Sequence, residues 1–501
     1  MANKIKGKYI FWGVIAFALL AVLFVLSLMG AKNKGEDARS TYTMQLSFDE
    51  NSNTLTGRQT IDYVNTSDNM FTSLPFHLYP NAFREGSKTP VVSTANKAEA
   101  YPNGESFGQI EITSVKYIDK SPANFEICGK DNNILNVILQ EELYPEESTQ
   151  LEISFITTLP NINHRLGFGE NTINFGNFYP VVCVYEEGVG FSQNPYHSNG
   201  DPFYSECADY YVSIKYSSNF TLASGGEITE NTQKEDKNLT QIKGENIRDF
   251  CFVLSKKFDK VSRQIDEVEV NYFGYAGDEN LQVCLQTSVD AMSTFQEMYG
   301  KYPYNQISIV KSNFVHGGME YPNIVLISDK ITAQNDINYV IVHELAHQWW
   351  YGLVGNDQYN HAWIDEGLAE FSTLLFFERH ESYAENPQLL IENAIQSYKL
   401  FEKVYTKVAG SVDGTMQRPL CDFNTEPEYV QCVYTKGLIM FDCLREGIGE
   451  KKLLQTLKYI VKLYSYKTIS SAEFIACFAD KCGKSMEGFF QSWLDGRVVI
   501  Q

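Results

Sequence analysis

The stretch VHELAHQWW, residues 342–350, predicts the central helix of the fold and its first two functional side chains. His343 and His347 are four residues apart, so on a helix their imidazoles lie one above the other and can reach a single metal ion. Apolar residues before them recur at helical spacing, with Asp336 as the expected N-cap and Gly352 as the expected end. We expect a metal-binding helix rather than an amphipathic helix with two histidines by chance, because the chain has only eight histidines.

A second helical stretch, IDEGLAEFSTLLFFER, follows after the loop NDQYNHAW. Eighteen residues separate His347 from Glu366, which lies near the start of this second helix. A catalytic zinc ion needs a third protein ligand and an open position. If the second helix folds back against the first, Glu366 supplies that ligand. We therefore predict one zinc ion per chain, held by His343, His347 and Glu366.

Glutamates beside these ligands predict the chemistry. Glu344 is adjacent to His343, so its carboxylate projects beside the metal rather than onto it. That placement suits a general base that takes a proton from water and passes it to a leaving amine, which predicts metal-assisted hydrolysis of an amide. Glu370 lies four residues after Glu366 on the same helical face. It could accept a hydrogen bond from a ligand imidazole or be an ordinary exposed glutamate.

Composition limits the other classes of function. A chain of 501 residues with 44% hydrophobic content is long enough for two or three domains with their own cores. The net charge of -21 argues against a nucleic acid partner, because the chain offers no basic stripe to a phosphate backbone. The ten cysteines fit an oxidising compartment but form no CxxC pair, and each could be a buried thiol or half of a disulfide, so the sequence assigns no connectivity.

The first forty residues differ from the rest. Tyr9 to Met29 carry no charge over a length that spans a hydrocarbon core of about 30 Å. We predict a cytoplasmic tail at 1–8, a single transmembrane anchor at 9–29 and a linker at 30–40, with the catalytic part outside the cytoplasm at the cell membrane. The lipid bilayer is then a partner. A cleaved signal peptide is the alternative, although SLMGAK matches a cleavage site poorly.

The remaining chain predicts an α+β fold. From residue 41 to 260, apolar and polar residues alternate around turns such as DENSN and YPEES, as in the strands of an antiparallel sandwich or saddle-like domain. From 264 to 501, helical spacing prevails, with two strand-like runs, ISIV and NIVLIS, around HGGMEYP. The predicted order is an N-terminal transmembrane helix, an antiparallel β domain and a mixed α/β catalytic domain rich in helix.

The motif HELAHQWW with WIDEGLAEF at this spacing resembles the aminopeptidase N family of zinc metallopeptidases, which are gluzincins. GGMEY resembles the family's GxMEN strand, and VYTKG resembles its YxKG stretch. The resemblance implies that Glu320 binds the free amino group of the substrate beside Gly317, Gly318 and Met319. It also implies that Tyr434 stabilises the oxyanion of the tetrahedral intermediate.

The stretches NFGNFYP, GDPFYSE and FFQSWLDG look like landmarks of bacterial members. The resemblance therefore spans nearly everything after the anchor and implies a saddle-like N-terminal domain followed by a thermolysin-like zinc peptidase domain. Many members continue into a large helical domain that covers the active site, and we expect this protein to be a short member without that domain. Tyr321 also stands where the family pattern has Asn. Both departures leave exopeptidase strictness open.

Three functions follow from these features. The leading hypothesis is a membrane-anchored zinc aminopeptidase that removes N-terminal residues from peptides outside the cytoplasm. Glu320 favours it, because a carboxylate facing an ammonium group is left unpaired when the substrate has no free amino end. The alternative is a zinc endopeptidase with an open cleft. A non-catalytic peptide-binding scaffold is less favoured, because the ligands, the base and the tyrosine are all present.

Overall fold

The computed structural model describes residues 39–383 and 385–500 of the chain. The chain divides into two units, Met1–Arg39 and Ser40–Gln501, and every element below belongs to the second unit. The predicted cytoplasmic tail, membrane anchor and nearly all of the linker lie outside the described residues. Among the described residues, no helix combines the length and apolar character needed to cross a membrane.

A seven-stranded sheet has the order β15-β16-β13-β1-β2-β7-β4. Its strands are β1 (Thr41–Asp49), β2 (Thr54–Val64), β4 (Gln109–Tyr117), β7 (Ser148–Thr158), β13 (Ala208–Ser217), β15 (Glu227–Lys234) and β16 (Lys237–Ile247). β1 and β2 form the predicted antiparallel hairpin. The expectation of a purely antiparallel arrangement is wrong at one place, because β1 and β13 run parallel. These strands are far apart in sequence, and such a long connection permits parallel pairing.

Two four-stranded sheets have the orders β10-β3-β6-β5 and β14-β17-β9-β8. The first contains β3 (Phe71–His77), β5 (Asn124–Cys128), β6 (Ile134–Leu143) and β10 (Val181–Val182); the second contains β8 (Leu166–Phe168), β9 (Ile173–Phe175), β14 (Thr221–Ser224) and β17 (Phe252–Ser255). Although β6 and β7 are joined by the predicted turn, they belong to different sheets. Short elements complete this region: η1 (Tyr79–Phe83), α2 (Lys97–Ala100), β11 (Tyr185–Glu186) and β12 (Gly190–Phe191).

A five-stranded mixed sheet begins the second half, with the order β18-β19-β20-β22-β21. Its strands are β18 (Phe258–Ile265), β19 (Val268–Tyr275), β20 (Gln306–Ser312), β21 (Gly318–Met319) and β22 (Ile324–Ser328), and α3 (Leu281–Tyr299) joins the parallel strands β19 and β20. The sequence pattern weakens at β18 because this strand has no fully buried residue. The predicted boundary near residues 260–264 falls within β18, and the division into two domains stays a prediction.

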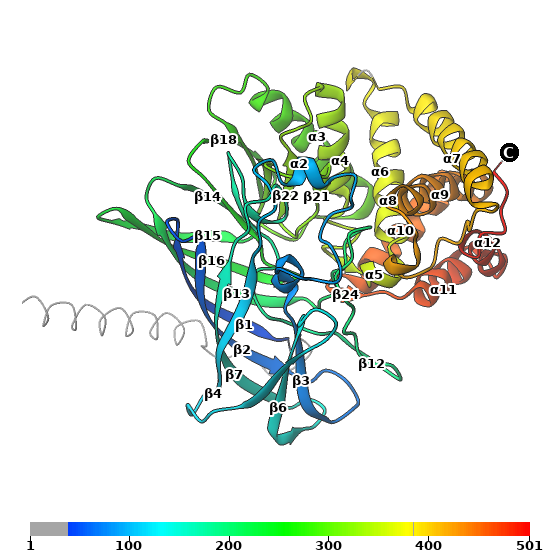
Figure 1. The fold of residues 1–501 in the computed structure, drawn as a ribbon. Helices are drawn as coiled ribbons and strands as arrows, with labels where there is room; N and C mark the ends of the chain where they lie inside the picture. Colours follow the sequence, from blue (N-terminus) through cyan, green and yellow to red (C-terminus); the bar gives the residue numbers. More distant parts are fainter. Residues whose placement is uncertain (1–38, 384, 501) are drawn as a thin grey trace, which may run out of the picture. The chain divides into compact units, whose positions relative to one another are not determined.

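The chain after β22 is mostly helical, as predicted. It contains α4 (Gln334–Ala346), α5 (Gln358–His361), α6 (Asp365–Arg379), α7 (Pro387–Ala409), α8 (Glu426–Val430), α9 (Lys436–Ile448), α10 (Glu450–Tyr464), α11 (Ser471–Cys482) and α12 (Ser485–Leu494), with the short strands β23 (Val354–Gly355) and β24 (Lys467–Thr468). Within Ser40–Gln501, the helices α7 to α12 gather on the side opposite strands β1 to β7 (Figure 1).

The bounds of α4 differ from the sequence prediction. Its N-cap is Ala333, so Asp336 lies in the first turn, and the helix ends at Ala346 rather than near Gly352. The amides that follow bond three residues back, from Gln348 to Leu345 and from Trp349 to Ala346, which tightens the last turn. His347 is therefore the C-cap residue of α4.

Candidate active site

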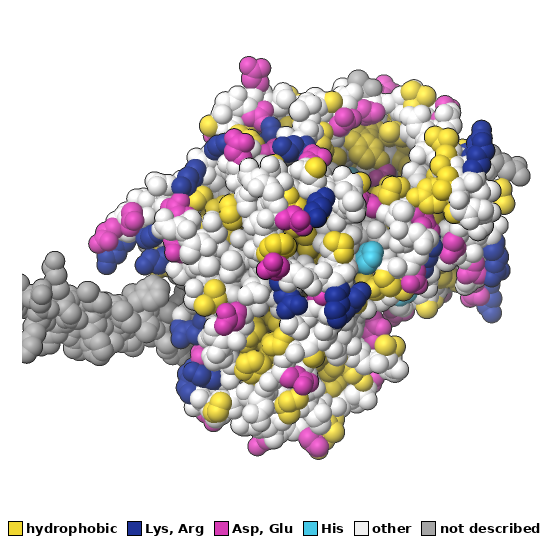
Figure 2. All heavy atoms as spheres, in the orientation of Figure 1, with side chains coloured by type: hydrophobic (Ala, Val, Ile, Leu, Met, Phe, Trp, Pro, Cys, Tyr) yellow, Lys and Arg dark blue, Asp and Glu magenta, His cyan; other side chains and the backbone are white. Residues whose placement is uncertain are grey.

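Two helices bring the predicted metal ligands together. α4 packs against α6, so that His343 in the last turn of α4 and His347 at its C-cap face Glu366 in the first turn of α6. The Nε2 atoms of the two imidazoles lie 3.2 Å apart. Oε2 of Glu366 lies 3.4 Å from each of them. The molecular surface is hollowed near α4 and α6 (Figure 2).

These separations fit a zinc ion. Tetrahedral zinc holds its ligands about 2.0–2.2 Å away, which places neighbouring ligand atoms about 3.3–3.6 Å from each other. Oε2 of Glu366 is buried and has no hydrogen-bond partner among the described residues. Two imidazoles and one carboxylate leave one tetrahedral position open, as in catalytic zinc sites. The donor atoms therefore match zinc in type, number and spacing.

The charges of the three predicted ligands also fit a metal cation. Burial favours the neutral form of Glu366, but the imidazoles of His347 and His343 outweigh it and lower the pKa of Glu366 to about 2. Burial also lowers the pKa of His347, but Glu366 outweighs it and raises that pKa to about 10. The buried group thus retains positive charge beside its carboxylate. A divalent cation supplies that charge directly and releases the protons.

Each ligand imidazole has a partner on its other nitrogen. Nδ1 of His347 lies 3.0 Å from the carbonyl oxygen of Trp350. Nδ1 of His343 lies 3.2 Å from Oε1 of Glu370, and the hydroxyl of Tyr339 donates to the other oxygen of Glu370. The hydrogen bond to Trp350 holds the proton on Nδ1 of His347 and turns its Nε2 toward a metal. The structure thus places Glu370 behind a ligand imidazole.

Glu344 lies beside the ligands and against a glycine. It is buried, and a Cβ atom added to Gly318 would come within 2.2 Å of its Oε1. Burial raises the pKa of Glu344 to about 7, although His343 and His347 act to lower it. A carboxyl group with a pKa near neutrality can both accept and return a proton. The close approach of β21 is possible because residue 318 has no side chain.

A second group of carboxylates adjoins the ligands. Glu320 is buried, and its Oε1 accepts a hydrogen bond from Nε2 of Gln358 at 2.6 Å. One oxygen each of Asp201, Glu320 and Glu366 lie within 4.8 Å of one another. Burial, and then the charge of Asp201, raises the pKa of Glu320 well above its ordinary value. Arg165 forms an ion pair with Asp201, but no residue in 39–383 or 385–500 forms an ion pair with Glu320, so a cationic group is its complementary ligand.

Tyr434 lies beside the predicted metal ligands and belongs to a π-helical turn, Gln431–Thr435. Its ring lies parallel to that of His343, with centroids 6.0 Å apart and 11° between the planes. Burial, and then the charge of Glu366, raises the pKa of Tyr434 well above its ordinary value. The hydroxyl therefore stays protonated at neutral pH and can donate a hydrogen bond.

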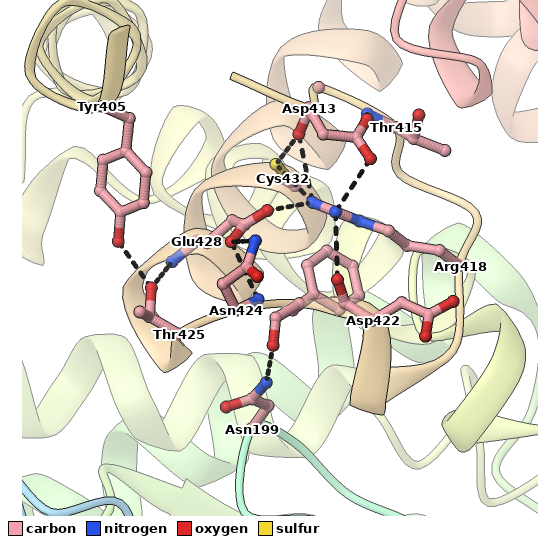
Figure 3. Close-up of polar contacts among 12 residues, drawn as sticks. Asn199, Tyr405, Asp413, Thr415, Arg418, Asp422, Asn424, Thr425, Glu428 and Cys432 are labelled. Atoms are coloured by element: carbon pink, nitrogen blue, oxygen red, sulfur yellow. Dashed lines mark hydrogen bonds and ion pairs between the residues drawn. The ribbon is translucent and has the colours of Figure 1, made fainter. Parts of the chain in front are cut away.

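A polar network fixes the segment that leads to Tyr434 (Figure 3). The guanidinium of Arg418 donates to Glu428 at 2.7 Å and to Asp413 at 3.1 Å. Asn199, from the β region, donates to the carbonyl oxygen of Phe423 at 2.8 Å. The segment before the π-helical turn is thus held by contacts among neighbouring residues and by one distant residue, Asn199.

The remaining residues of the GGMEY motif are Met319, Tyr321 and Gly317. Met319 is fully buried and packs in the core of the β region, and its expected role in substrate binding stays a prediction. The side chain of Tyr321 is also buried, and its hydroxyl donates to Asn177 at 2.6 Å. The tyrosine that stands in place of the family's Asn therefore packs in the core. A Cβ atom on Gly317 would meet only Val340, at 3.7 Å.

Sequence reasoning missed Asp201 and Gln358. Asp201 lies in GDPFYSE, which stood out only as part of a resemblance, and Gln358 lies in the loop NDQYNHAW. Neither has a spacing that relates it to the histidines. The resemblance of GDPFYSE was the one signal that could have pointed to Asp201.

Comparisons with known proteins agree with this geometry. Residues 283–493 match the model of the Peptidase family M1 domain. Leucine aminopeptidase 2 of Yarrowia lipolytica is 26% identical over 192 residues, which are 36% of this chain and 29% of that protein. Endoplasmic reticulum aminopeptidase 2 of Homo sapiens is 23% identical over 218 residues, which are 40% of this chain and 22% of that protein. The matches thus span well under half of these relatives.

A solved structure shares the fold over almost the whole chain. The M1 zinc metallopeptidase from Deinococcus radiodurans superposes with a TM-score of 0.65 at 15% identity, covering 93% of this chain and 96% of that chain. A mutant of a two-domain M1 zinc metallopeptidase bound to L-arginine superposes with a TM-score of 0.62 at 14% identity, covering 94% of this chain and 96% of that chain. Both the β region and the helical region therefore follow a known arrangement.

Proposed function

We propose that this chain, a member of peptidase family M1, is a zinc-dependent aminopeptidase that removes N-terminal residues from peptides. His343, His347 and Glu366 hold the zinc ion in this proposal. The observation that carries it is the juxtaposition of this ligand group with the carboxylates of buried Glu320 and half-buried Asp201, whose oxygens lie within 4.8 Å of an oxygen of Glu366.

The proposed reaction divides the chemistry among the residues of the site. Zinc, when bound, acts as a Lewis acid that lowers the pKa of water and polarises a peptide carbonyl. Glu344 takes the proton from the attacking water and passes it to the nitrogen of the leaving peptide, for which a pKa of about 7 is suited. Tyr434 donates a hydrogen bond to the oxyanion that forms at the scissile carbonyl.

Glu320 and Asp201 select the end of the peptide. Together they present negative charge that one arginine, Arg165, balances only in part. A free N-terminal ammonium group is a small cation that hydrogen-bonds to both carboxylates, whereas an acetylated N-terminus brings no charge and leaves them unpaired. An ammonium group held by these carboxylates lies close to the metal ligands, because their oxygens are within 4.8 Å of an oxygen of Glu366, and this supports cleavage near the N-terminus.

The setting of the enzyme is a further part of the proposal. We place the catalytic part outside the cytoplasm at the cell membrane, held by an anchor at residues 9–29. Only the uncharged sequence of Tyr9 to Met29 supports this.

One experiment tests the function. The purified full chain, with its zinc content measured, is incubated with one peptide in free and N-acetylated forms, and the products are followed by mass spectrometry. Glu344→Gln serves as the inactive control. We expect stepwise loss of N-terminal residues from the free form only. Internal cleavage of both forms would show an endopeptidase, and no cleavage by a zinc-loaded protein would support a peptide-binding scaffold instead.

A further inference from the structure

Arg248 joins three distant parts of the chain at the end of the zinc-binding helix. It follows β16 in the β region and is 1% exposed. Its Nε donates to the carbonyl oxygen of Tyr351 at 2.8 Å, and its two terminal nitrogens donate to the carbonyl oxygens of Ser205 at 2.6 Å and Lys467 at 2.8 Å. All three acceptors are backbone atoms. A rigid, planar fork of donors is the property that distinguishes arginine from lysine.

The guanidinium of Arg248 fits at this junction because residue 355 is a glycine. A Cβ atom added to Gly355 would lie 2.1 Å from Cζ of Arg248. Gly355 belongs to β23, which pairs in parallel with β24, the strand that contains Lys467. The amide of Ile469 donates to the carbonyl oxygen of Gly355 at 2.7 Å, and that of Tyr466 donates to Leu353 at 2.7 Å. Arg248 thus closes a junction that already ties residues 353–355 to 466–469.

One acceptor at this junction has a strained backbone. Tyr351 has a φ of 126°, a conformation that residues other than glycine rarely adopt. Such a conformation persists only when its surroundings impose it. The amide of Tyr351 donates to Val354 at 2.9 Å, while its carbonyl oxygen accepts from Arg248. Arg248 therefore supplies one of the two hydrogen bonds that hold the strained residue.

This strained residue sets the direction of the carbonyl group before it. The φ angle of Tyr351 turns the peptide unit that contains the Trp350 carbonyl relative to the following chain. That carbonyl oxygen lies 3.0 Å from Nδ1 of His347. A metal-binding histidine is oriented by the hydrogen bond on its other nitrogen, and loss of such a partner weakens metal binding.

We propose that Arg248 is a positioning residue for the metal centre. It holds Tyr351 in its strained conformation, and through the Trp350 carbonyl it orients the imidazole of His347. The β region thereby contributes to metal affinity without touching the metal site. This inference rests on the proposed function, because it requires that His347 binds zinc.

Two variants disturb the junction in different ways. Arg248→Lys keeps the charge but loses the three-armed fork, and Gly355→Ala displaces the guanidinium while Arg248 remains. Arg445→Lys is the matched control, because Arg445 bonds to the carboxylates of Glu378 and Asp442 and not to this junction. Zinc affinity of the folded full chain is measured by competition with a chromophoric chelator, and the visible spectrum of the cobalt-loaded protein reports ligand geometry.

We expect Arg248→Lys and Gly355→Ala to bind zinc about 10–100-fold more weakly and to change the cobalt spectrum, whereas Arg445→Lys matches the wild type. Wild-type affinity and an unchanged spectrum in both folded variants would overturn the inference. Failure of the wild type itself to bind zinc would instead overturn the proposed function.

A measurement on the wild type needs no variant. Coupling between two sites is reciprocal, so removal of zinc should loosen the junction. We expect faster amide hydrogen exchange at residues 350–355, 204–207 and 466–469 in the zinc-free protein, with no change in β2. Equal exchange at all three segments with and without zinc would contradict the role of Arg248, even if both variants failed to fold.

Discussion

The ring of Tyr434 lies parallel to the imidazole of His343, with 6.0 Å between their centroids and 11° between their planes. A π-helical turn carries the tyrosine, and α4 carries the histidine. π-Helical turns are rare and are frequently found at functional sites. The phenol is therefore held beside a predicted metal ligand by irregular local structure, which fits a catalytic group better than a packing residue.

Removal of the Tyr434 hydroxyl should slow hydrolysis without unfolding the protein. We expect Tyr434→Phe to lower kcat by roughly 10²–10³ with a small change in KM, because one hydrogen bond to the oxyanion is lost. Steady-state kinetics on a free peptide measures this. Tyr405→Phe is the control, since the Tyr405 hydroxyl bonds only to Thr425 in the neighbouring network (Figure 3). If Tyr434→Phe lowers kcat by less than about threefold, the tyrosine has a packing role and not a catalytic one.

A methyl group at residue 318 should act on the general base. The Cβ atom of Gly318→Ala would come within 2.2 Å of Oε1 of Glu344, so the carboxylate must move. We expect kcat to fall at least tenfold while zinc content stays at one ion per chain, because a small misplacement of a catalytic group is costly. Metal analysis and kinetics of the same preparation separate the two effects.

Gly317→Ala is the matched control for that substitution. Its Cβ atom would meet only a side-chain carbon of Val340 at 3.7 Å, an ordinary contact. Glu344→Gln should show the full loss of hydrolysis with zinc retained. Equal activity of Gly318→Ala and Gly317→Ala would mean that Glu344 is not held where the base must act.

The carboxylate of Asp201 should matter for substrates with a free amino end. We expect Asp201→Asn to raise KM for a free peptide about tenfold or more, because a charged partner of the ammonium group is lost. Glu320→Gln should raise KM further, since none of the residues that the structure describes forms an ion pair with Glu320. Binding of a free and an N-acetylated peptide to the zinc-loaded Glu344→Gln protein separates the effects, with the acetylated peptide unaffected. Equal losses for both peptides would assign Asp201 to stability of the site.

Much of the site could be predicted from local spacing alone. His343, His347 and Glu366 belong to two helices that follow one another closely, so the periodicity of each helix and one short loop bring them together. Asp201 could not be placed in this way, because it depends on the packing of the β region against the helical region. Arg248 is similar: its bonds to Ser205, Tyr351 and Lys467 join segments that no sequence period connects.

In the fold, too, local features could be predicted from the sequence and long-range pairings could not. The hairpin of β1 and β2 follows from alternation and a turn, whereas the parallel pairing of β1 with β13 depends on a partner far along the chain. Tyr321 illustrates the limit for side chains: the sequence showed only that it departs from the family pattern, and the partner of its hydroxyl, Asn177 in the core, is distant in sequence.

The buried carboxyl group of Asp249 should make stability depend on pH. Burial raises its pKa from 3.8 to about 6, although hydrogen bonds from Tyr179, the Phe250 amide and Asn177 act to lower it. The folded protein therefore binds a proton here more tightly than the unfolded chain. This contribution to stability is fully present below about pH 4 and is lost as the pH rises through about 6. A shift of about two pKa units corresponds to roughly 3 kcal/mol.

Asp249→Asn removes this dependence, because an amide does not titrate in this range. We expect the free energy of unfolding of the wild type, relative to the variant, to fall between pH 4.5 and pH 7, as measured by urea denaturation with a chelator present to exclude effects of zinc. Asp119→Asn is the control: hydrogen bonds from Ser121 lower the pKa of Asp119 below its ordinary value of 3.8, so this carboxyl group is ionised in both states across this range and we expect a constant difference. A constant difference between wild type and Asp249→Asn across this range would mean that Asp249 is ionised throughout and that its three donors outweigh its burial.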